Sequence, residues 1–133
     1  MQPPLCLPLE PHPASPAIAR DHARDFVGTW VEPEVVDDLS LLVTEVVANA
    51  IRHAGSDIRL EMSMSHGVVR VEVFDGSSEL PVLRHPAPSS DSGRGLRLVD
   101  ALASRWGSRR QLDGKVVWFE LILLHQGIPR IGH

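Results

Sequence analysis

Residues 42–54 read LVTEVVANAIRHA, and this stretch defines the first long element of the chain. Its apolar residues recur three or four positions apart, which places them on one side of an α-helix. The pattern extends back to about Glu34, and Gly55 stands where many helices end. We therefore predict a helix over about residues 34–54. Its apolar side is predicted to consist of Val36, Leu39, Val43, Val46, Val47, Ala50 and Ala54.

Two polar residues of this helix, Glu45 and Asn49, lie four positions apart. On a helix they share one face, about 40° from each other, and Glu45 lies roughly 150° from the centre of the apolar side. One interpretation is an ordinary solvated face. The other is a carboxylate that orients a nucleophile, beside an amide oxygen that holds a hard cation such as Mg²⁺. His53, at the helix end, is by itself more typical of a surface histidine than of a ligand.

Two antiparallel hairpins are predicted downstream of this helix. Residues 58–64 and 68–74 alternate apolar and polar side chains, as half-buried strands do, and His66-Gly67 supplies the turn between them. A second pair of strands, at about 108–112 and 115–124, meets at Asp113-Gly114, a strong hairpin signal.

Two further helices are predicted, over about residues 16–31 and 95–106. Ser15 and Pro16 suit the N-cap and first position of the earlier one. Its apolar side is predicted to contain Ile18, His22, Ala23, Phe26, Val27 and Trp30. Residues 77–92 are rich in proline and serine and show no periodicity, and a long irregular stretch of this kind is often a functional loop.

The length of 133 residues suits one domain. Six of the eleven prolines fall within residues 1–16, so we expect a flexible proline-rich tail over 1–15, a folded domain over 16–124 and a C-terminal tail over 125–133. Helices that are separate from antiparallel hairpins predict an α+β fold, a two-layer sandwich of helices on a sheet.

The composition excludes several classes of protein. The 13 basic and 17 acidic residues give a net charge of −4, which argues against direct binding of nucleic acid. No apolar run approaches the roughly 18 residues of a membrane span, and the first residues, MQPPLCLPLEPHP, do not resemble a signal peptide, so we expect a cytoplasmic protein. The single cysteine, Cys6, excludes an internal disulfide and a cysteine-rich zinc site. No P-loop or Rossmann signature is present.

Two more positions invite both a structural and a functional interpretation. Asp75 follows the strand at 68–74 and precedes a glycine, so it is either a turn aspartate or a carboxylate that accepts hydrogen bonds from an exocyclic amine. Gly93-Arg94-Gly95-Leu96 opens the next helix and is either a flexible hinge or a set of backbone amides that bind phosphate, with Arg94 as an added cation.

The order of these features resembles that of the GHKL family, whose ATP-binding domain has the Bergerat fold. The resemblance rests on residues 42–54, on Val71-Glu72-Val73-Phe74-Asp75 and on Ser92-Gly93-Arg94-Gly95-Leu96, and it covers about residues 15–124. The chain is most similar to small bacterial anti-sigma-factor serine/threonine kinases and related ATP-binding regulators. The resemblance implies a mixed, mostly antiparallel sheet with helices on one face.

The resemblance also implies a role for each quoted residue. Glu45 would be the general base, Asn49 the Mg²⁺ ligand and Asp75 the acceptor for the adenine amino group. Residues 77–92 would form a lid over ATP. The residues implied in nucleotide binding are Asn49, His53, Asp75, Ser92, Gly93, Arg94, Gly95 and Leu96.

The implied activity is phosphorylation of a protein serine. The reaction would form part of a partner switch that involves a sigma factor, an anti-sigma-factor antagonist or both. A homodimer is compatible with this activity. The family usually has D-x-G-x-G where this chain has Asp75-Gly76-Ser77-Ser78-Glu79, and the missing glycines leave a second hypothesis open. In that hypothesis the protein is an ATP-binding regulatory module that sequesters a partner with little or no phosphotransfer.

Overall fold

The computed structural model describes residues 3–54, 56–77 and 94–123. These residues form five strands and three helices. In chain order the elements are β1 (Leu5–Leu9), α1 (Ser15–Val27), α2 (Pro33–Ala54), β2 (Ile58–Ser65), β3 (Val68–Asp75), α3 (Arg94–Leu102), β4 (Arg105–Gln111) and β5 (Gly114–Ile122).

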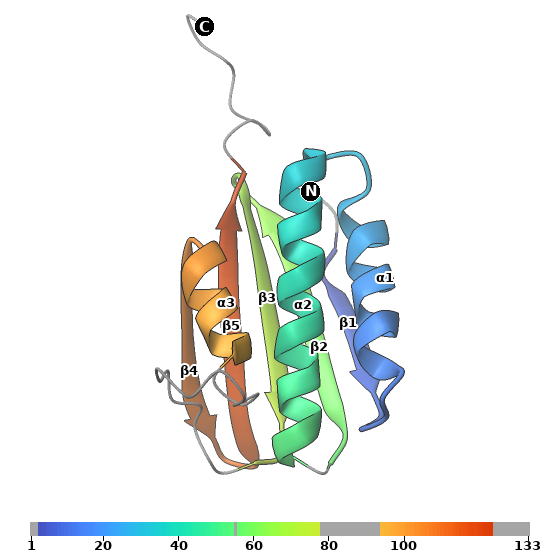
Figure 1. The fold of residues 1–133 in the computed structure, drawn as a ribbon, viewed down its shortest axis with the longest axis vertical. Coiled ribbons are helices and arrows are strands. Elements are labelled where there is room, and N and C mark those ends of the chain that lie inside the picture. The colour runs from blue at the N-terminus through green and yellow to red at the C-terminus, as the bar shows by residue number, and fades with distance from the viewer. Residues whose placement is uncertain (1–2, 55, 78–93, 124–133) are drawn as a thin grey trace, which may run out of the picture.

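The strands form a single sheet in the order β1-β2-β3-β5-β4, and the three helices lie on one face of it (Figure 1). This arrangement confirms the predicted two-layer α+β fold. Each of the four strand pairs is antiparallel, so the sheet of the described residues contains no parallel pair and is not mixed.

The β2–β3 hairpin has the predicted position and register. Ser65 pairs with Val68, and the two residues between them, His66 and Gly67, have φ angles of 52° and 76°. Positive φ at both central residues is typical of the tight turn that matches the twist of a hairpin. The alternation of apolar residues in both strands directs one set of side chains, including Met62 opposite Val71, toward the helices.

Helix α2 lies between α1 and α3 and covers the middle of the sheet (Figure 1). The prediction of this helix is confirmed, with its start at Pro33 instead of Glu34. Most of the large, fully buried side chains of the core come from α2 and from the inner face of the sheet, and α1 and α3 each add one valine. They are Leu39, Leu42, Val43 and Val47 of α2, Leu60, Met62, Val69, Val71, Val73 and Phe119 of the sheet, Val27 of α1 and Val99 of α3.

Helix α1 is shorter than predicted. It ends at Val27 because Gly28 leaves the helix with a φ of 53°, so the expected extension to residue 31 is wrong. Its buried side is formed by Ala19, Ala23 and Val27, whereas Ile18 and Trp30 are 45% and 66% exposed. The helix therefore packs through small residues one turn apart, and the larger apolar residues that we assigned to its buried side lie partly in water.

The start of α1 also differs from the prediction. Ala14 is the N-cap residue and makes no side-chain capping bond. The Ser15 hydroxyl, the predicted cap, instead donates to the carbonyl oxygen of Glu10 at 2.6 Å. This bond ties the helix start to the segment that follows β1.

Helix α3 ends at Leu102, four residues before the predicted end, and Trp106 belongs to β4, where it pairs with Phe119. The chain leaves the helix where the Ser104 amide donates to the carbonyl oxygen of Glu120 at 2.8 Å, a bond to β5 that begins the strand. Trp106 was assigned to the helix because its position continues the apolar period of α3. An apolar residue is equally expected there in a strand whose side chain points to the core.

Residues 5–9 correct the expectation of a flexible tail over 1–15. They form β1, which pairs along its whole length with β2, and Leu9 is buried. The prolines permit this because β1 is an edge strand, where a residue without an amide donor is tolerated. The predicted tail over 125–133 lies outside the described residues.

The outer face of the sheet, opposite the helices, carries a network of ion pairs around Trp118. Arg70 donates to Glu120 at 2.8 Å and lies 4.3 Å from the centre of the Trp118 ring, while Glu72 lies 3.3 Å from Arg70. Gly107, paired with Trp118 in the register, leaves room for the indole, since a Cβ there would lie 2.9 Å from the ring.

Candidate functional site

Glu45 and Asn49 lie on the side of α2 that faces away from α1. Ser40 marks the opposite side, because its hydroxyl accepts a hydrogen bond from Arg24 of α1 at 2.9 Å. Asn49 follows Ser40 by nine positions, which is about half a turn around the helix axis. Since α2 lies between α1 and α3, Asn49 is directed to the α3 side (Figure 1). It is buried, with 6% of its surface exposed, and Glu45 is half-buried.

Arg52 is a neighbour of Asn49 that the sequence analysis did not single out. Its Nη2 donates to Asn49 Oδ1 at 3.2 Å. The spacing of three residues on one helix was the available signal, since such pairs are in contact. The hydrogen bond holds the Asn49 amide with its oxygen toward the guanidinium group of Arg52. The same oxygen is the atom that would bind a metal ion.

Asp75 is the last residue of β3, and its carboxylate is buried on the inner face of the sheet. Oδ1 accepts a hydrogen bond from the Ser77 amide at 2.8 Å. Oδ2 lies 3.5 Å from Nζ of Lys115, and the two side chains are only 1% and 3% exposed. Oδ2 accepts no hydrogen bond among the described residues. A buried acceptor without a donor is uncommon in folded proteins and marks a position where a ligand donor would be favoured.

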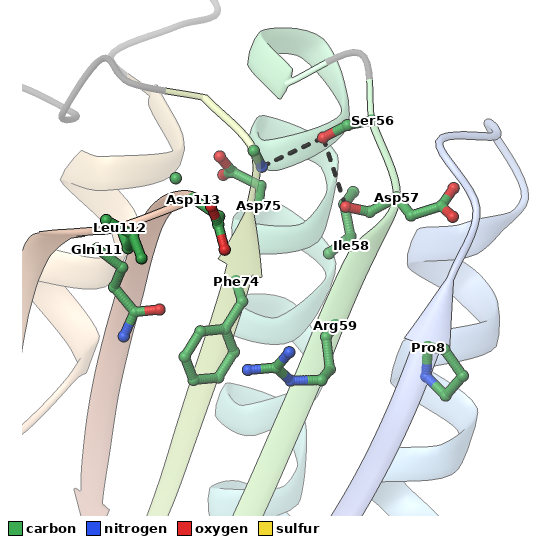
Figure 2. Close-up of a pocket in the computed structure, with 12 residues that line it drawn as sticks. Pro8, Ser56, Asp57, Ile58, Arg59, Phe74, Asp75, Gln111, Leu112 and Asp113 are labelled. Atoms are coloured by element: carbon green, nitrogen blue, oxygen red, sulfur yellow. Dashed lines mark hydrogen bonds between the residues drawn. The ribbon is translucent and has the colours of Figure 1, made fainter.

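Two glycines let the chain close around the backbone of Asp75. The Gly76 amide donates to the Ser56 hydroxyl at 3.2 Å, and a Cβ at Gly76 would lie 2.7 Å from that oxygen (Figure 2). Gly114 has a φ of 154°, and a Cβ there would overlap the carbonyl oxygen of Asp75. The position of Asp75 therefore depends on glycine in the β4–β5 turn.

The C-terminal end of α2 and the end of β3 lie at one end of the molecule, and α3 packs beside α2 with its start directed toward that end (Figure 1). Arg94, Gly95 and Leu96 form the first turn of α3. His53 is exposed in the last turn of α2. Ser92, Gly93 and the predicted lid beyond Ser77 lie outside the described residues.

A hollow of about 640 Å³ lies at the same end, and Asp75 contributes to its wall. Its other lining residues include Arg59 and Phe74, which project from the face of the sheet opposite α2 (Figure 2). Neither Glu45 nor Asn49 lines it. This hollow is therefore distinct from the predicted nucleotide site, which lies on the helix side of the sheet.

The described residues fit a nucleotide and a cation in their chemistry. The free acceptor on Asp75 suits the amino group of a base, and the amide oxygen of Asn49 suits Mg²⁺, which prefers oxygen ligands. The first turn of α3 supplies backbone amides of the kind that bind phosphate.

Residues 9–121 match the family described as the histidine kinase-like ATPase domain. The chain belongs to this family. Membership implies ATP as the ligand and agrees with the GHKL resemblance of the sequence. Among the described elements, all the helices and strands fall within the match except most of β1 and the last residue of β5.

Solved structures of this family share the fold. The histidine kinase domain of a blue-light activated histidine kinase from Erythrobacter litoralis is 25% identical, with a TM-score of 0.56, over 85% of this chain and 61% of that chain. A longer structure of the same kinase is 24% identical, with a TM-score of 0.57, over 88% of this chain and 42% of that chain. This histidine kinase-like ATPase therefore spans less than two thirds of either.

An uncharacterized protein of Streptomyces coelicolor is 40% identical over 81 residues, which are 56% of this chain and 76% of that protein. Among the described helices, none combines the length and the apolar composition that a membrane crossing requires.

Proposed function

We propose that the protein is an ATP- and Mg²⁺-dependent serine/threonine protein kinase of the anti-sigma type. In this proposal it binds a sigma factor and phosphorylates a serine of an anti-sigma-factor antagonist, and the phosphorylation decides which partner it holds. Family membership supports the nucleotide-binding part. The kinase activity and the partners extend beyond it.

The observation that carries the proposal is the buried carboxylate oxygen of Asp75 that lacks a hydrogen-bond donor. Its carboxylate is buried at the end of β3, and Oδ2 has no hydrogen-bond donor among the described residues. An adenine amino group is a donor of the required kind. The segment of α2 that holds Glu45 and Asn49 reaches the same end of the molecule (Figure 1).

The proposed reaction needs a base, a cation and positioned donors more than covalent catalysis. The oxygen of the acceptor serine forms a bond to the γ-phosphorus of ATP, and the bond from that phosphorus to the bridging oxygen breaks to release ADP. The hydroxyl proton passes to the carboxylate of Glu45. Asn49 would hold Mg²⁺, which neutralises charge on the phosphates. The amides of the first turn of α3 would contact the phosphate oxygens.

A second function, sequestration of a partner with little phosphotransfer, is favoured by one observation. Arg52 already donates to Asn49 Oδ1, so the proposed metal ligand is occupied by a cationic group. Ser77 stands in a segment where the family usually has glycines, and its amide is committed to Asp75. Both features are compatible with a protein that binds the nucleotide but transfers its phosphate slowly.

The decisive experiment measures binding and transfer separately. ATP is titrated into the full chain by calorimetry with Mg²⁺ and with EDTA, and transfer from labelled ATP to a candidate antagonist protein is followed by phosphoserine analysis. A kinase is expected to transfer phosphate to serine, and Glu45→Gln is expected to lower the rate roughly 100-fold or more while ATP still binds.

Two outcomes contradict parts of the proposal. Magnesium-dependent ATP binding without any transfer supports the sequestering module and excludes the kinase. Transfer that is unchanged in Glu45→Gln excludes Glu45 as the base. Glu34→Gln, which changes a carboxylate in the first turn of the same helix, is the matched control.

A further inference from the structure

Strand β4 is the last strand of the sheet, and only one of its two sides is paired. It pairs with β5 from Arg105 to Gln111, and the strand order places no described strand on its other side. In an antiparallel sheet, the backbone amides and carbonyls of alternate residues point to the same neighbouring strand. Every second residue of β4 therefore directs a backbone donor and a backbone acceptor away from the sheet.

The unpaired side of β4 is long enough to hold a further strand. Figure 1 shows β4 at the margin of the sheet. The strand has seven residues, and a typical strand has about 5–6. None of its residues is a proline, so each of its backbone amides can donate a hydrogen bond. An extended peptide segment laid along β4 would supply the missing partners for these backbone groups.

The side chains of β4 make this margin of the sheet basic. The strand reads RWGSRRQ, with three arginines and no acidic residue, in a chain whose net charge is −4. The side chains of Arg105 and Arg109 are 70% and 51% exposed, and Arg110 is exposed as well. A positively charged strand on an acidic protein favours a negatively charged partner at this position.

The carboxylates near β4 do not neutralise its arginines. Glu120 and Glu72 belong to the network on the outer face of the sheet, where Arg70 lies 2.8 Å and 3.3 Å from them. Arg105 lies farther from Glu120, at 3.6 Å, and Arg109 lies 3.9 Å from Glu72. Two carboxylates therefore face three arginines, and the two arginines of β4 are the more distant and more exposed members.

We infer that β4 is a docking edge for an extended acidic segment of a partner protein, which joins the sheet as a further strand and sets its carboxylates against Arg105 and Arg109. A second copy of this chain fits less well, because β4 beside β4 would bring like charges together. A nucleic acid supplies negative charge but has no peptide backbone to pair with the strand. The inference goes beyond the proposed function and does not rest on nucleotide binding.

The test uses the full chain, isotopically labelled and observed by NMR, and two synthetic peptides of the same length as β4. One alternates glutamate with valine, and the other alternates lysine with valine. The glutamate peptide is expected to bind at least about tenfold more tightly. In its complex, hydrogen exchange is expected to slow at every second amide of β4, because strand addition protects alternate amides. Equal affinities, binding of neither peptide, or unchanged exchange along β4 would each overturn the inference.

Two matched variants test the role of the arginines. Arg109→Glu reverses a charge on β4, and Arg20→Glu makes the same change on α1, which packs against α2, β1 and β2. The two side chains have similar exposure, 51% and 41%. Arg109→Glu is expected to weaken binding of the glutamate peptide about fivefold, because repulsion replaces an exposed attraction. Arg20→Glu is expected to change the affinity by less than about twofold, because solvent and salt screen distant charges. An equal loss in both variants would overturn the inference.

Two further outcomes would assign this margin of the sheet to another occupant. A single-stranded DNA oligonucleotide that binds more tightly than the glutamate peptide would favour nucleic acid and overturn the inference. Slow exchange at alternate amides of β4 in the peptide-free protein, increasing with protein concentration, would favour a second copy and also overturn it. None of these measurements contains a nucleotide, so their failure is distinguishable from failure of the proposed function.

Discussion

Lys115 and Asp75 form an ion pair that is shut off from water where β3 ends and β5 begins, with Nζ 3.5 Å from Oδ2. Buried pairs of this kind contribute little net stability, because desolvation of the two charges offsets their attraction. Removal of one partner, however, leaves a charge in the protein interior. The pair therefore favours one register of the two strands over alternatives.

The first prediction concerns the stability of this pair. Lys115→Met is expected to lower the free energy of unfolding by about 3–5 kcal/mol, since it leaves Asp75 buried without a counter-ion. Asp75→Asn combined with Lys115→Met is expected to recover most of the loss, because both charges are then absent. Urea denaturation followed by circular dichroism measures both. If the loss of unfolding free energy in the double variant equals the sum of the losses in the two single variants, Lys115 and Asp75 are not coupled as described.

The second prediction concerns the turn that holds Asp75. Gly114→Ala is expected to destabilise the fold by more than about 3 kcal/mol, because its Cβ would lie 2.9 Å from the carbonyl carbon of Asp75 and would overlap the attached oxygen. Gly28→Ala is the control, since Gly28 also has a positive φ but a Cβ there would meet only ordinary van der Waals contacts, the nearest 3.7 Å away. That change is expected to cost only about 1–2 kcal/mol. Equal thermal shifts in the two variants would contradict the role of Gly114.

The third prediction separates Asn49 from Arg52 in nucleotide binding. Asn49→Ala is expected to weaken Mg-ATP binding by about tenfold or more and to leave metal-free ATP binding nearly unchanged, because it removes the proposed oxygen ligand. Arg52→Met breaks the hydrogen bond to Asn49 but keeps the amide, so the magnesium dependence is expected to remain. Calorimetric titrations with Mg²⁺ and with EDTA measure both. An Asn49→Ala variant with wild-type Mg-ATP affinity would remove the assignment of Asn49.

The fourth prediction concerns the outer face of the sheet. Gly107→Ala is expected to displace the Trp118 indole, because a Cβ at this position would lie 2.9 Å from the ring. The cost is about 1–3 kcal/mol, with a change in tryptophan fluorescence. In a Trp118→Ala background the same change is expected to cost far less. A cost that does not depend on Trp118 would show that the backbone, and not the indole, requires glycine.

The sequence predicted the elements whose pattern is unambiguous. Helix α2 and the β2–β3 hairpin have long apolar periods and clear turn residues, and their positions are correct to within one residue. Strand β1 was missed because prolines within residues 1–13 concealed a short edge strand that gains its stability from pairing with β2. The end of α3 was missed because one tryptophan fits both a helix period and a strand.

The candidate site was predictable only where its residues form a local motif. Glu45 and Asn49 share one helix, and Asp75 follows a strand, so their spacing was visible. Lys115 was not, because its partner is set by the register of two strands that are separated in sequence by residues 76–113. Periodicity indicates which face of a strand is buried, and only the pairing in space indicates which charges meet there.

The proline content of the first strand has a consequence for the protein in a crowded solution. Sheet edges are templates for strand addition by neighbouring molecules, and a residue without an amide hydrogen interrupts that template. Pro8 lies within β1, while Pro3, Pro4, Pro11 and Pro13 flank it. Without β1, strand β2 would form this edge of the sheet and would be open to self-association. The proline-rich segment pairs with the side of β2 that faces away from β3 and so covers that edge.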